Sequence, residues 1–372
     1  MFILVLSCKS IFSQEKERRS FFSYFGITPL NDTIRKESTG LMFAPILFYT
    51  PDTRWSAGAA GLSAFRLKDK NDSLAETRIS YLKFLGIYTF NNQFDSEMSW
   101  NVFTPLERYL IKGKLNFRNF PDRFYGIGNQ SLLEDREIYA YNSFLFNALF
   151  MKKMGRHFFA GFDYEFEREY NFRYDETGVL QFGEVTGYNG GTGSAFGLVS
   201  VFDNRDNILN AYKGMYAELS SYYFSEWFGS TFNFAKINVN VKQFNELRDK
   251  HILAFQFKSR LTFGDTPMLN MATLGGDDIL RGYASNRFRD NHFFALQSEY
   301  RFPLFWRFGM VAFAGGGDVF SRPQDLSWRN MKYAGGLGFR FLVNAAERIN
   351  GRIDFSYGSE GFNFYFGVSE SF

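Results

Sequence analysis

Few residues in this sequence are placed to carry out catalysis or to bind a metal. His157, His251 and His292 are the three histidines, and they are scattered without the spacing of a metal site. Ser259 lies on the same predicted strand as His251, roughly 27 Å away at strand geometry, so the two cannot form a Ser–His pair. Cys8, the single cysteine, has no partner for a disulfide or a CxxC metal site. These residues predict a protein that is not an enzyme and holds neither a metal nor a cofactor.

One arginine stands out by its setting. Arg281 lies in "GGDDILRGY" (275–283), where the apolar residues Ile279 and Leu280 precede it and Gly282 and Tyr283 follow it. A guanidinium forms charge-assisted hydrogen bonds with carboxylates, and the flanking glycine permits a tight reversal of the backbone. The segment either presents Arg281 to acidic side chains or is an ordinary surface loop. The elements around it decide between the two.

The composition favours an all-β protein. The 372 residues include 49 Phe, 21 Tyr and 34 Gly but only 8 Pro, a mixture rich in strand formers and tight-turn residues. The 42 Lys and Arg against 39 Asp and Glu give a net charge of +3, and both signs are scattered along the chain. Nucleic acid is therefore not an expected partner.

The first residues have the pattern of an export signal. "MFILVLSCKSIFSQ" (1–14) has an apolar core and then small residues, and the charged run "EKERR" follows it. An alternative is a lipoprotein signal cleaved before Cys8, because "VLSC" loosely resembles a lipobox. We expect residues 1–14 to be removed and residues 15–40 to form a short periplasmic segment.

The rest of the chain alternates between apolar and polar residues. In "HILAFQFKSRLTF" (251–263), Phe255 and Phe257 fall on one face of the predicted strand, whereas Gln256 and Lys258 fall on the other. A soluble β-sandwich also alternates in this way. No run of 18 apolar residues follows the signal, so helical membrane spans are excluded.

The number and length of these segments favour a membrane barrel over a sandwich. Most have the ten or so residues that cross a membrane at a tilt. The sixteen predicted strands are 41–50, 54–66, 77–89, 93–103, 109–119, 137–151, 156–168, 194–204, 213–224, 231–243, 251–263, 291–302, 307–318, 331–342, 349–357 and 362–372. An even number closes with both chain ends in the periplasm. The prediction is an all-β, 16-stranded antiparallel transmembrane β-barrel over residues 41–372, in the bacterial outer membrane.

Two further patterns agree with a barrel. The longest expected connections all follow an odd-numbered strand and so share one side, as long extracellular loops do. They are 120–136, 169–193, 264–290 and 319–330. The ending "FNFYFGVSESF" places a row of aromatic residues, closing with Phe372, on one lipid-facing side of the last strand. This ending resembles the C-terminal signal by which outer-membrane barrels are recognised for assembly.

Several short motifs resemble one family in the order that family has them. "LRGY" (280–283) resembles the (V/I/L)-R-G-(F/Y) motif in the sixth extracellular loop of BamA/TamA-type assembly barrels, the bacterial surface antigen family. "SEYRFPL" (298–304) resembles the twelfth strand and turn of that family, and "RFYGIGN" (123–129) an aromatic–glycine segment common in its members. "VFDNRDN" (201–207) resembles its Asp-x-Arg-Asp motif, here Asp203, Arg205 and Asp206. Four motifs in register are a strong signal, although each alone is weak.

The resemblance implies a lumenal role for Arg281. In such proteins this loop folds back into the barrel, and its arginine pairs with acidic residues of the inner wall. The alternation of "SEYRFPL" puts Glu299 on the face opposite Tyr300 and Phe302, so we expect Glu299 to point into the lumen and to pair with Arg281.

Three features depart from the family pattern. The family often has an acidic residue in the thirteenth strand, where this chain has Gly315, and Asp318 is the possible secondary acid. Ala211 stands where a proline is usual in the turn "AYKG". The family also implies periplasmic POTRA domains before the barrel, and residues 15–40 leave no room for one between the expected signal and the first strand.

The expected function is assistance in inserting or translocating proteins at the outer membrane. Pro45 cannot donate a hydrogen bond within its strand, and Gly367 invites a kink, so the first strand and the last strand, which ends at Phe372, form a candidate lateral seam. The expected partners are outer-membrane lipid, unfolded outer-membrane proteins and a periplasmic or lipoprotein partner. The alternative is a passive channel or structural barrel, alone or as a subunit of a larger complex.

Overall fold

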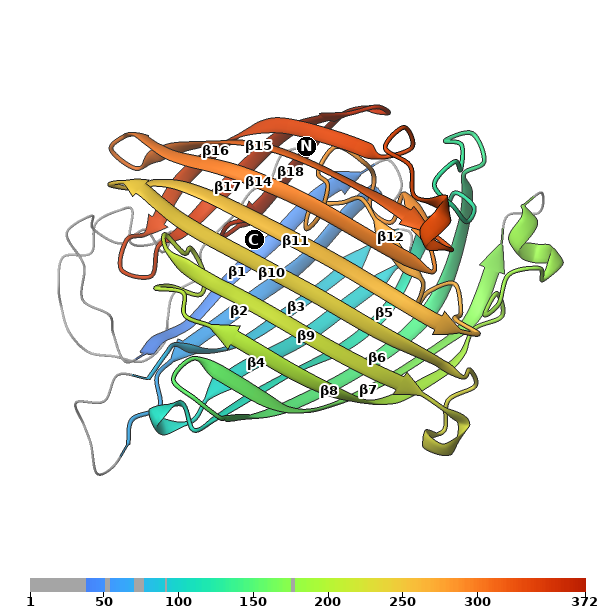
Figure 1. The fold of residues 1–372 in the computed structure, drawn as a ribbon, viewed down its shortest axis with the longest axis horizontal. Coiled ribbons are helices and arrows are strands. Elements are labelled where there is room, and N and C mark those ends of the chain that lie inside the picture. The colour runs from blue at the N-terminus through green and yellow to red at the C-terminus, as the bar shows by residue number, and fades with distance from the viewer. Residues whose placement is uncertain (1–37, 51–53, 70–76, 91, 175–177) are drawn as a thin grey trace.

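The strands of this chain form one barrel-shaped sheet. The computed structural model describes residues 38–50, 54–69, 77–90, 92–174 and 178–372. Sixteen strands pair antiparallel in chain order, and Figure 1 shows the sheet curved into a barrel of tilted strands. This confirms the predicted 16-stranded β-barrel. The expected signal over residues 1–14, and all but the last three residues of the 15–40 segment, lie outside the described residues.

The strand bounds follow the predicted segments closely. The sixteen strands of the barrel are β1 (Ser38–Thr50), β2 (Arg54–Phe65), β3 (Ser80–Thr89), β4 (Phe94–Phe103), β5 (Tyr109–Phe124), β6 (Glu137–Lys153), β7 (Phe158–Tyr174), β8 (Gly191–Asp203), β9 (Gly214–Phe224), β10 (Phe234–Arg248), β11 (His251–Gly264), β14 (His292–Phe305), β15 (Phe308–Phe320), β16 (Lys332–Asn344), β17 (Ile349–Gly358) and β18 (Gly361–Val368). The remaining pair, β12 (Ala272–Leu274) and β13 (Phe288–Asp290), forms a separate two-stranded sheet. β5 and β7 extend beyond their predicted ends, so the connections after them are shorter than expected.

Helical structure in the described part of the chain consists of short 3-10 turns. They are η2 (Pro105–Glu107), η3 (Val179–Phe182), η4 (Glu226–Phe228) and η5 (Pro323–Asp325). Across the described residues, we find no helix with the length and apolar character needed to span a membrane.

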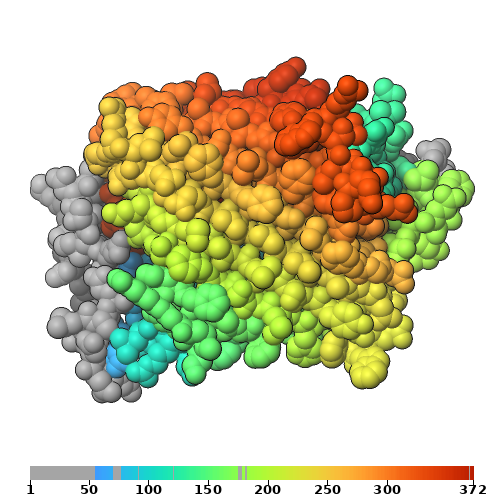
Figure 2. Space-filling model, in the orientation of Figure 1, coloured from blue at the N-terminus to red at the C-terminus, as the bar shows by residue number. Residues whose placement is uncertain are grey.

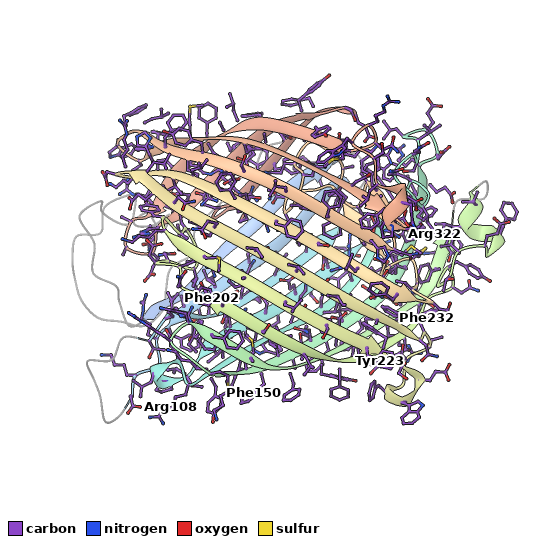
Figure 3. All side chains as sticks on the ribbon, viewed as in Figure 1. Arg108, Phe150, Phe202, Tyr223, Phe232 and Arg322 are labelled. Carbon is purple, nitrogen blue, oxygen red and sulfur yellow. The ribbon has the colours of Figure 1, made fainter. Side chains whose placement is uncertain are left out.

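The alternation of side chains separates a lipid-facing outer wall from the lumen. Phe150 of β6 and Tyr223 of β9 are about half exposed and point away from the barrel (Figure 3). Met151, the next residue after Phe150, is completely buried on the inner side. On the face seen in Figure 2, side chains cover the wall over the middle strands. A period of two thus separates exposed side chains that face lipid from buried side chains that face the lumen.

The two ends of the barrel differ in their connections. The long connections that follow β5, β7 and β15 project from the same end, on the right in Figure 1. The other end carries short turns, such as those that join β10 to β11 and β14 to β15. This arrangement agrees with the expected orientation, in which the short-turn end faces the periplasm.

The outer wall yields a direct test at Phe257, which lies near the middle of β11 and is exposed on the side opposite Lys258. We expect Phe257→Arg to destabilise the folded barrel by about 2–4 kcal/mol, because it places a charge in the hydrocarbon core. Lys258→Arg, which keeps a charge on the lumenal side, is the matched control and should leave stability unchanged. Denaturant unfolding in lipid vesicles measures both, and equal stability of the two variants would contradict the assigned faces.

Candidate functional site in the barrel lumen

The connection between β11 and β14 folds into the lumen and occupies part of it. Its β12–β13 hairpin is buried, and the segment between these strands carries Leu280 and Tyr283 into an apolar cluster. The wall supplies Phe293 and Ala295 of β14, with Ala334 of β16, to the same cluster. We call the segment 265–291 the lumen loop. Burial of its apolar residues brings Arg281 to the inner wall.

Arg281 fastens the lumen loop to three strands. Its side chain is fully buried, with 0% of its surface exposed. Nη2 donates to Oε1 of Glu299 on β14, and Nη1 donates to Oδ2 of Asp354 on β17 at 2.6 Å. The guanidinium also lies 3.8 Å from the ring centre of Phe313 on β15. The structure therefore brings Arg281 and Glu299 together and adds a second carboxylate.

The carboxylates that hold Arg281 are themselves held by other arginines. Arg301 Nε donates to Glu299 at 2.8 Å, and Arg340 Nη1 donates to Asp354 at 2.5 Å. The network joins four arginines to four carboxylates, all buried except the half-exposed Asp277: Arg281, Arg301, Arg340 and Arg352 with Glu299, Asp354, Asp277 and Glu370. Buried charges are tolerated when they are paired, and each arginine of this network contacts at least one carboxylate, although each also keeps one buried nitrogen without a hydrogen-bond partner.

The residues after Arg281 are clamped by the last strand. Gly282 has a φ of +131°, and a side chain there would approach Ala334 Cβ to 2.7 Å, so only glycine fits. Asn363 Nδ2 of β18 donates to the Gly282 carbonyl at 2.8 Å. The Tyr365 hydroxyl donates to the Tyr283 carbonyl at 2.9 Å and accepts from the Gly282 N–H at 3.2 Å. The tip of the lumen loop is thus bonded to a strand at one end of the sheet.

The two predicted seam positions have distinct surroundings. Pro45 pairs with Ala59 of β2, and β1 stands at one end of the hydrogen-bonded strand order. Gly367 of β18 pairs with Arg352 of β17, and a side chain at Gly367 would lie 2.6 Å from the Arg352 guanidinium. Gly367 therefore makes room for an arginine of the buried network.

The predicted position of Phe372 on the lipid-facing row is wrong. Phe362, Phe364 and Phe366 do lie on the outer face, each at least 43% exposed. However, β18 ends at Val368, and Ser369 adopts a φ of +69°, which breaks the alternation. Phe372 is only 7% exposed.

The last residues instead turn into the lumen and join the buried network. The Phe372 ring packs in an apolar cluster with Phe244, and its carbonyl accepts from Arg301 at 2.7 Å. Glu370 accepts from Arg340 at 2.7 Å, and the Ser371 hydroxyl donates to the Asp277 carbonyl of the lumen loop at 2.8 Å. We call residues 369–372 the C-terminal tail, which touches both the loop and the wall.

Asp318 does not serve as the second acid for Arg281. It accepts from Asn129 at 3.2 Å, while Asp354 of β17 occupies the position next to Arg281. Sequence reasoning missed Asp354, although the alternation in "GRIDFSYG" puts it on the same face as Arg352. Gly315, where an acid was expected, lies against Gln297, with only 2.9 Å to the Gln297 Cβ. A side chain at Gly315 would meet Gln297, and the second acid that contacts Arg281 is Asp354 on β17.

The Asp-x-Arg-Asp motif organises the turn between β8 and β9. Asp203 accepts from Arg205 Nε at 2.8 Å, and Asp206 accepts from Arg348 Nη1 at 2.6 Å. Asp206 also accepts from the Tyr212 N–H at 2.9 Å. Burial raises the pKa of Asp206, but the Arg348 contact and the backbone donors outweigh it and hold the pKa below its usual value. The motif is a structural clasp at the short-turn end.

The "RFYGIGN" segment also contacts the lumen loop. The Gly128 N–H donates to the Arg289 carbonyl at 2.7 Å, and the Arg287 guanidinium lies 4.5 Å from the ring centre of Tyr125. This segment therefore contacts the lumen loop at and just before β13, a few residues after "LRGY". Over the residues that the structure describes, no group of three His, Cys, Asp or Glu side chains is arranged to hold a metal ion.

A 16-stranded outer-membrane β-barrel with an arginine-bearing loop folded into its lumen is the class that this fold and site define. The chain belongs to the Omp85 superfamily, whose domain model matches residues 92–372. This match confirms the resemblance to BamA/TamA-type barrels that the short motifs indicated. No curated protein matches the sequence.

Solved structures support the same fold at low sequence identity. The chain is similar to BamA from Haemophilus ducreyi lacking POTRA domains 1-3, with a TM-score of 0.56 and 12% identity over 90% of this chain and 70% of that one. It is also similar to CdiB from Acinetobacter baumannii, with a TM-score of 0.54 and 11% identity over 90% of this chain and 60% of that one. For CdiB from Escherichia coli the TM-score is 0.50, with 12% identity over 90% of this chain and 60% of that one. The chain thus spans 60–70% of the length of these proteins.

The Arg281 contacts predict a coupled loss of stability. Arg281→Ala should destabilise the barrel by about 3 kcal/mol, because it leaves Glu299 and Asp354 short of a partner in a buried setting. Glu299→Ala removes the same contact, so the double variant should cost clearly less than the sum of the single ones. Gel-shift melting of the folded barrel measures all three.

Asp318→Asn provides the control, since Asp318 does not touch Arg281. Its effect should add to that of Arg281→Ala. Simple additivity of Arg281→Ala with Glu299→Ala would show that the lumen loop is not held through this pair.

Proposed function

We propose that this barrel helps to insert or translocate proteins at the outer membrane and has no enzymatic activity. Omp85 barrels such as BamA and CdiB mediate protein insertion or translocation there. The observation that carries the proposal is the bonding of the lumen loop to β18, a strand at one end of the sheet order. A barrel that handles protein strands needs a wall it can open, and this loop is attached at the edge of the wall.

The seam between β1 and β18 is the proposed place of opening. Pro45 in β1 has no N–H to donate, which weakens any strand pairing at that edge. An incoming strand could pair with a free edge by β-augmentation. The proposed partners are outer-membrane lipid, unfolded outer-membrane proteins, and a periplasmic or lipoprotein subunit. We also propose that residues 1–14 are an export signal and that residues 15–40 lie in the periplasm before the barrel.

Crosslinking tests the seam. In a Cys8→Ser background, one cysteine is placed in β1 and one in β18, and a disulfide is formed between them after folding. We expect the locked barrel to lose the ability to assist folding of an outer-membrane protein into vesicles, because the incoming strand has no free edge. Reduction of the disulfide should restore the activity.

A crosslink inside the wall is the matched control. Val241→Cys with Phe257→Cys joins β10 to β11 at positions that face each other in the register. This lock should leave activity unchanged. If the seam crosslink forms efficiently and the activity persists, the barrel does not work through an opening between β1 and β18.

The second candidate function is a passive channel. The lumen near the short-turn end holds a cavity of about 230 Å³, which leaves part of the interior unfilled. Conductance in planar bilayers separates the two functions. A barrel occupied by the lumen loop should give small, fluctuating currents, and Arg281→Ala should enlarge them by releasing the loop. Large and steady currents from the unaltered protein would favour the channel.

A further inference from the structure

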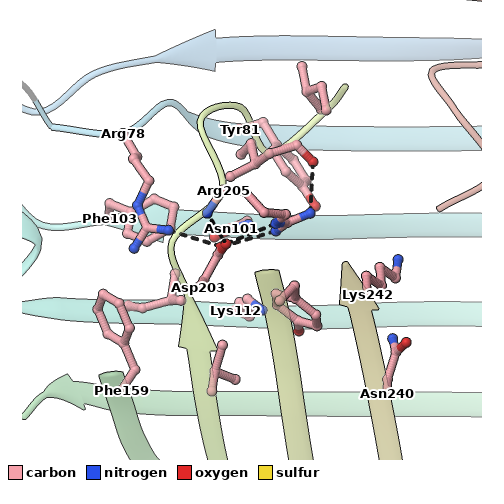
Figure 4. Close-up of a pocket in the computed structure, with 15 residues that line it drawn as sticks. Arg78, Tyr81, Asn101, Phe103, Lys112, Phe159, Asp203, Arg205, Asn240 and Lys242 are labelled. Carbon is pink, nitrogen blue, oxygen red and sulfur yellow. Dashed lines mark hydrogen bonds and ion pairs between the residues drawn. The ribbon is translucent and has the colours of Figure 1, made fainter. Parts of the chain in front are cut away.

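A cavity at the short-turn end of the lumen is lined by cationic side chains from separate elements. It measures about 230 Å³. Figure 4 shows Arg78, Lys112, Arg205 and Lys242 around it, with Asp203 as the single carboxylate of its lining. These residues come from the segment before β3, from β5, from the turn after β8 and from β10. The cavity is separate from the Arg281 network, with which it shares no residue.

The two arginines of the cavity already have an acidic partner. Arg78 Nη1 donates to Asp203 at 3.0 Å, and Arg205 contacts the same carboxylate through Nε at 2.8 Å and Nη2 at 3.0 Å. Arg78 also contacts Glu107 at 2.9 Å. Asp203 and Glu107 therefore offset the two guanidinium groups, and any excess positive charge of the lining comes from its two lysines.

The two lysines of the cavity are not paired with any acid among the residues that the structure describes. The contacts shown for Lys112 and Lys242 are with the ring of Tyr216, whose centre lies 6.0 Å from each ammonium nitrogen. The Tyr216 hydroxyl itself donates to Glu218. An ammonium group carries three donors, and a ring face satisfies none of them as a carboxylate or phosphate oxygen would. These two lysines have donors available for an anion.

We propose that this cavity binds a phosphate group through Lys112 and Lys242, with Arg78 and Arg205 completing the positive lining. Asp203 and Glu107 offset the two arginines, which leaves the two lysines, and a single added carboxylate would balance only one of them. A phosphate monoester carries about −1.5 to −2 charge at neutral pH, which balances both lysines. Lysine binds phosphate as a mobile point charge. The volume corresponds to roughly seven or eight water molecules, enough for one phosphate with a few waters.

Two sources could supply such a group, a free phosphate compound or the headgroup of a lipid. The shared chemistry is a phosphate monoester or inorganic phosphate held in the lumen near the proposed periplasmic mouth. This site goes beyond the proposed function, since neither the lumen loop nor the seam takes part in it. Its failure would leave the seam proposal intact.

Phosphorus NMR of the purified barrel in neutral detergent and phosphate-free buffer tests the proposal. The probes are inorganic phosphate, sn-glycerol 3-phosphate and dioctanoyl phosphatidic acid. We expect saturable line broadening with at least one probe, and Lys112→Gln with Lys242→Gln should weaken that binding by at least about tenfold. Broadening with the soluble probes assigns a free-phosphate source, and broadening with the lipid alone assigns a headgroup.

The matched control removes two lysines outside the cavity. Lys213 and Lys250 are exposed in turns at the same end of the barrel, so Lys213→Gln with Lys250→Gln should retain full binding. Gel-shift analysis checks that both double variants remain folded. The proposal is overturned if no probe gives saturable broadening, if the cavity variant binds as well as the unaltered protein, or if both double variants lose binding equally.

Discussion

The bridge from Arg281 to Glu299 and Asp354 is the interaction on which the interior of this barrel depends. A guanidinium with no exposed surface is stable only where carboxylates surround it, and here the two carboxylates belong to β14 and β17. Three other arginines bind the same carboxylates or their neighbours, so Asp354 is shared by three guanidinium groups and Glu299 by two. The lumen loop, the wall and the C-terminal tail therefore behave as one electrostatic unit.

Small residues in the wall make this unit possible. Gly282 turns beside Ala334, and Gly367 leaves room for the Arg352 guanidinium. The same strand, β18, presents Asn363 and Tyr365 to the loop backbone. β18, at one end of the strand order, thus contacts the lumen loop with its inner face. Its outer face presents Phe362, Phe364 and Phe366 to lipid. Its position is held by lumenal contacts as well as by pairing with β17.

Period-two alternation was sufficient to predict the sixteen strands and the inward direction of Glu299. It could not identify Asp354 as the second partner, although it puts Asp354 on an inward face. Two inward residues on different strands meet only if the tilt and stagger of the barrel place them at the same height, and a single sequence does not specify that stagger. Phe372 was misplaced for a different reason. The alternation fails at Ser369, whose left-handed backbone turns the tail toward space that only the assembled lumen provides.

The two groups of lumenal cations differ in a way that follows from their side chains. The network around Arg281 is built from arginines, whose planar forks bond two acids at once and lose little freedom when fixed. The cavity beside Asp203 adds lysines, which are compact, flexible and strongly hydrated charges. In this network every arginine is ion-paired with a carboxylate, and the arrangement serves to hold the loop. Where the lysines face a hollow without an ion-paired acid, their ammonium donors remain available, and the proposed phosphate site lies there for that reason.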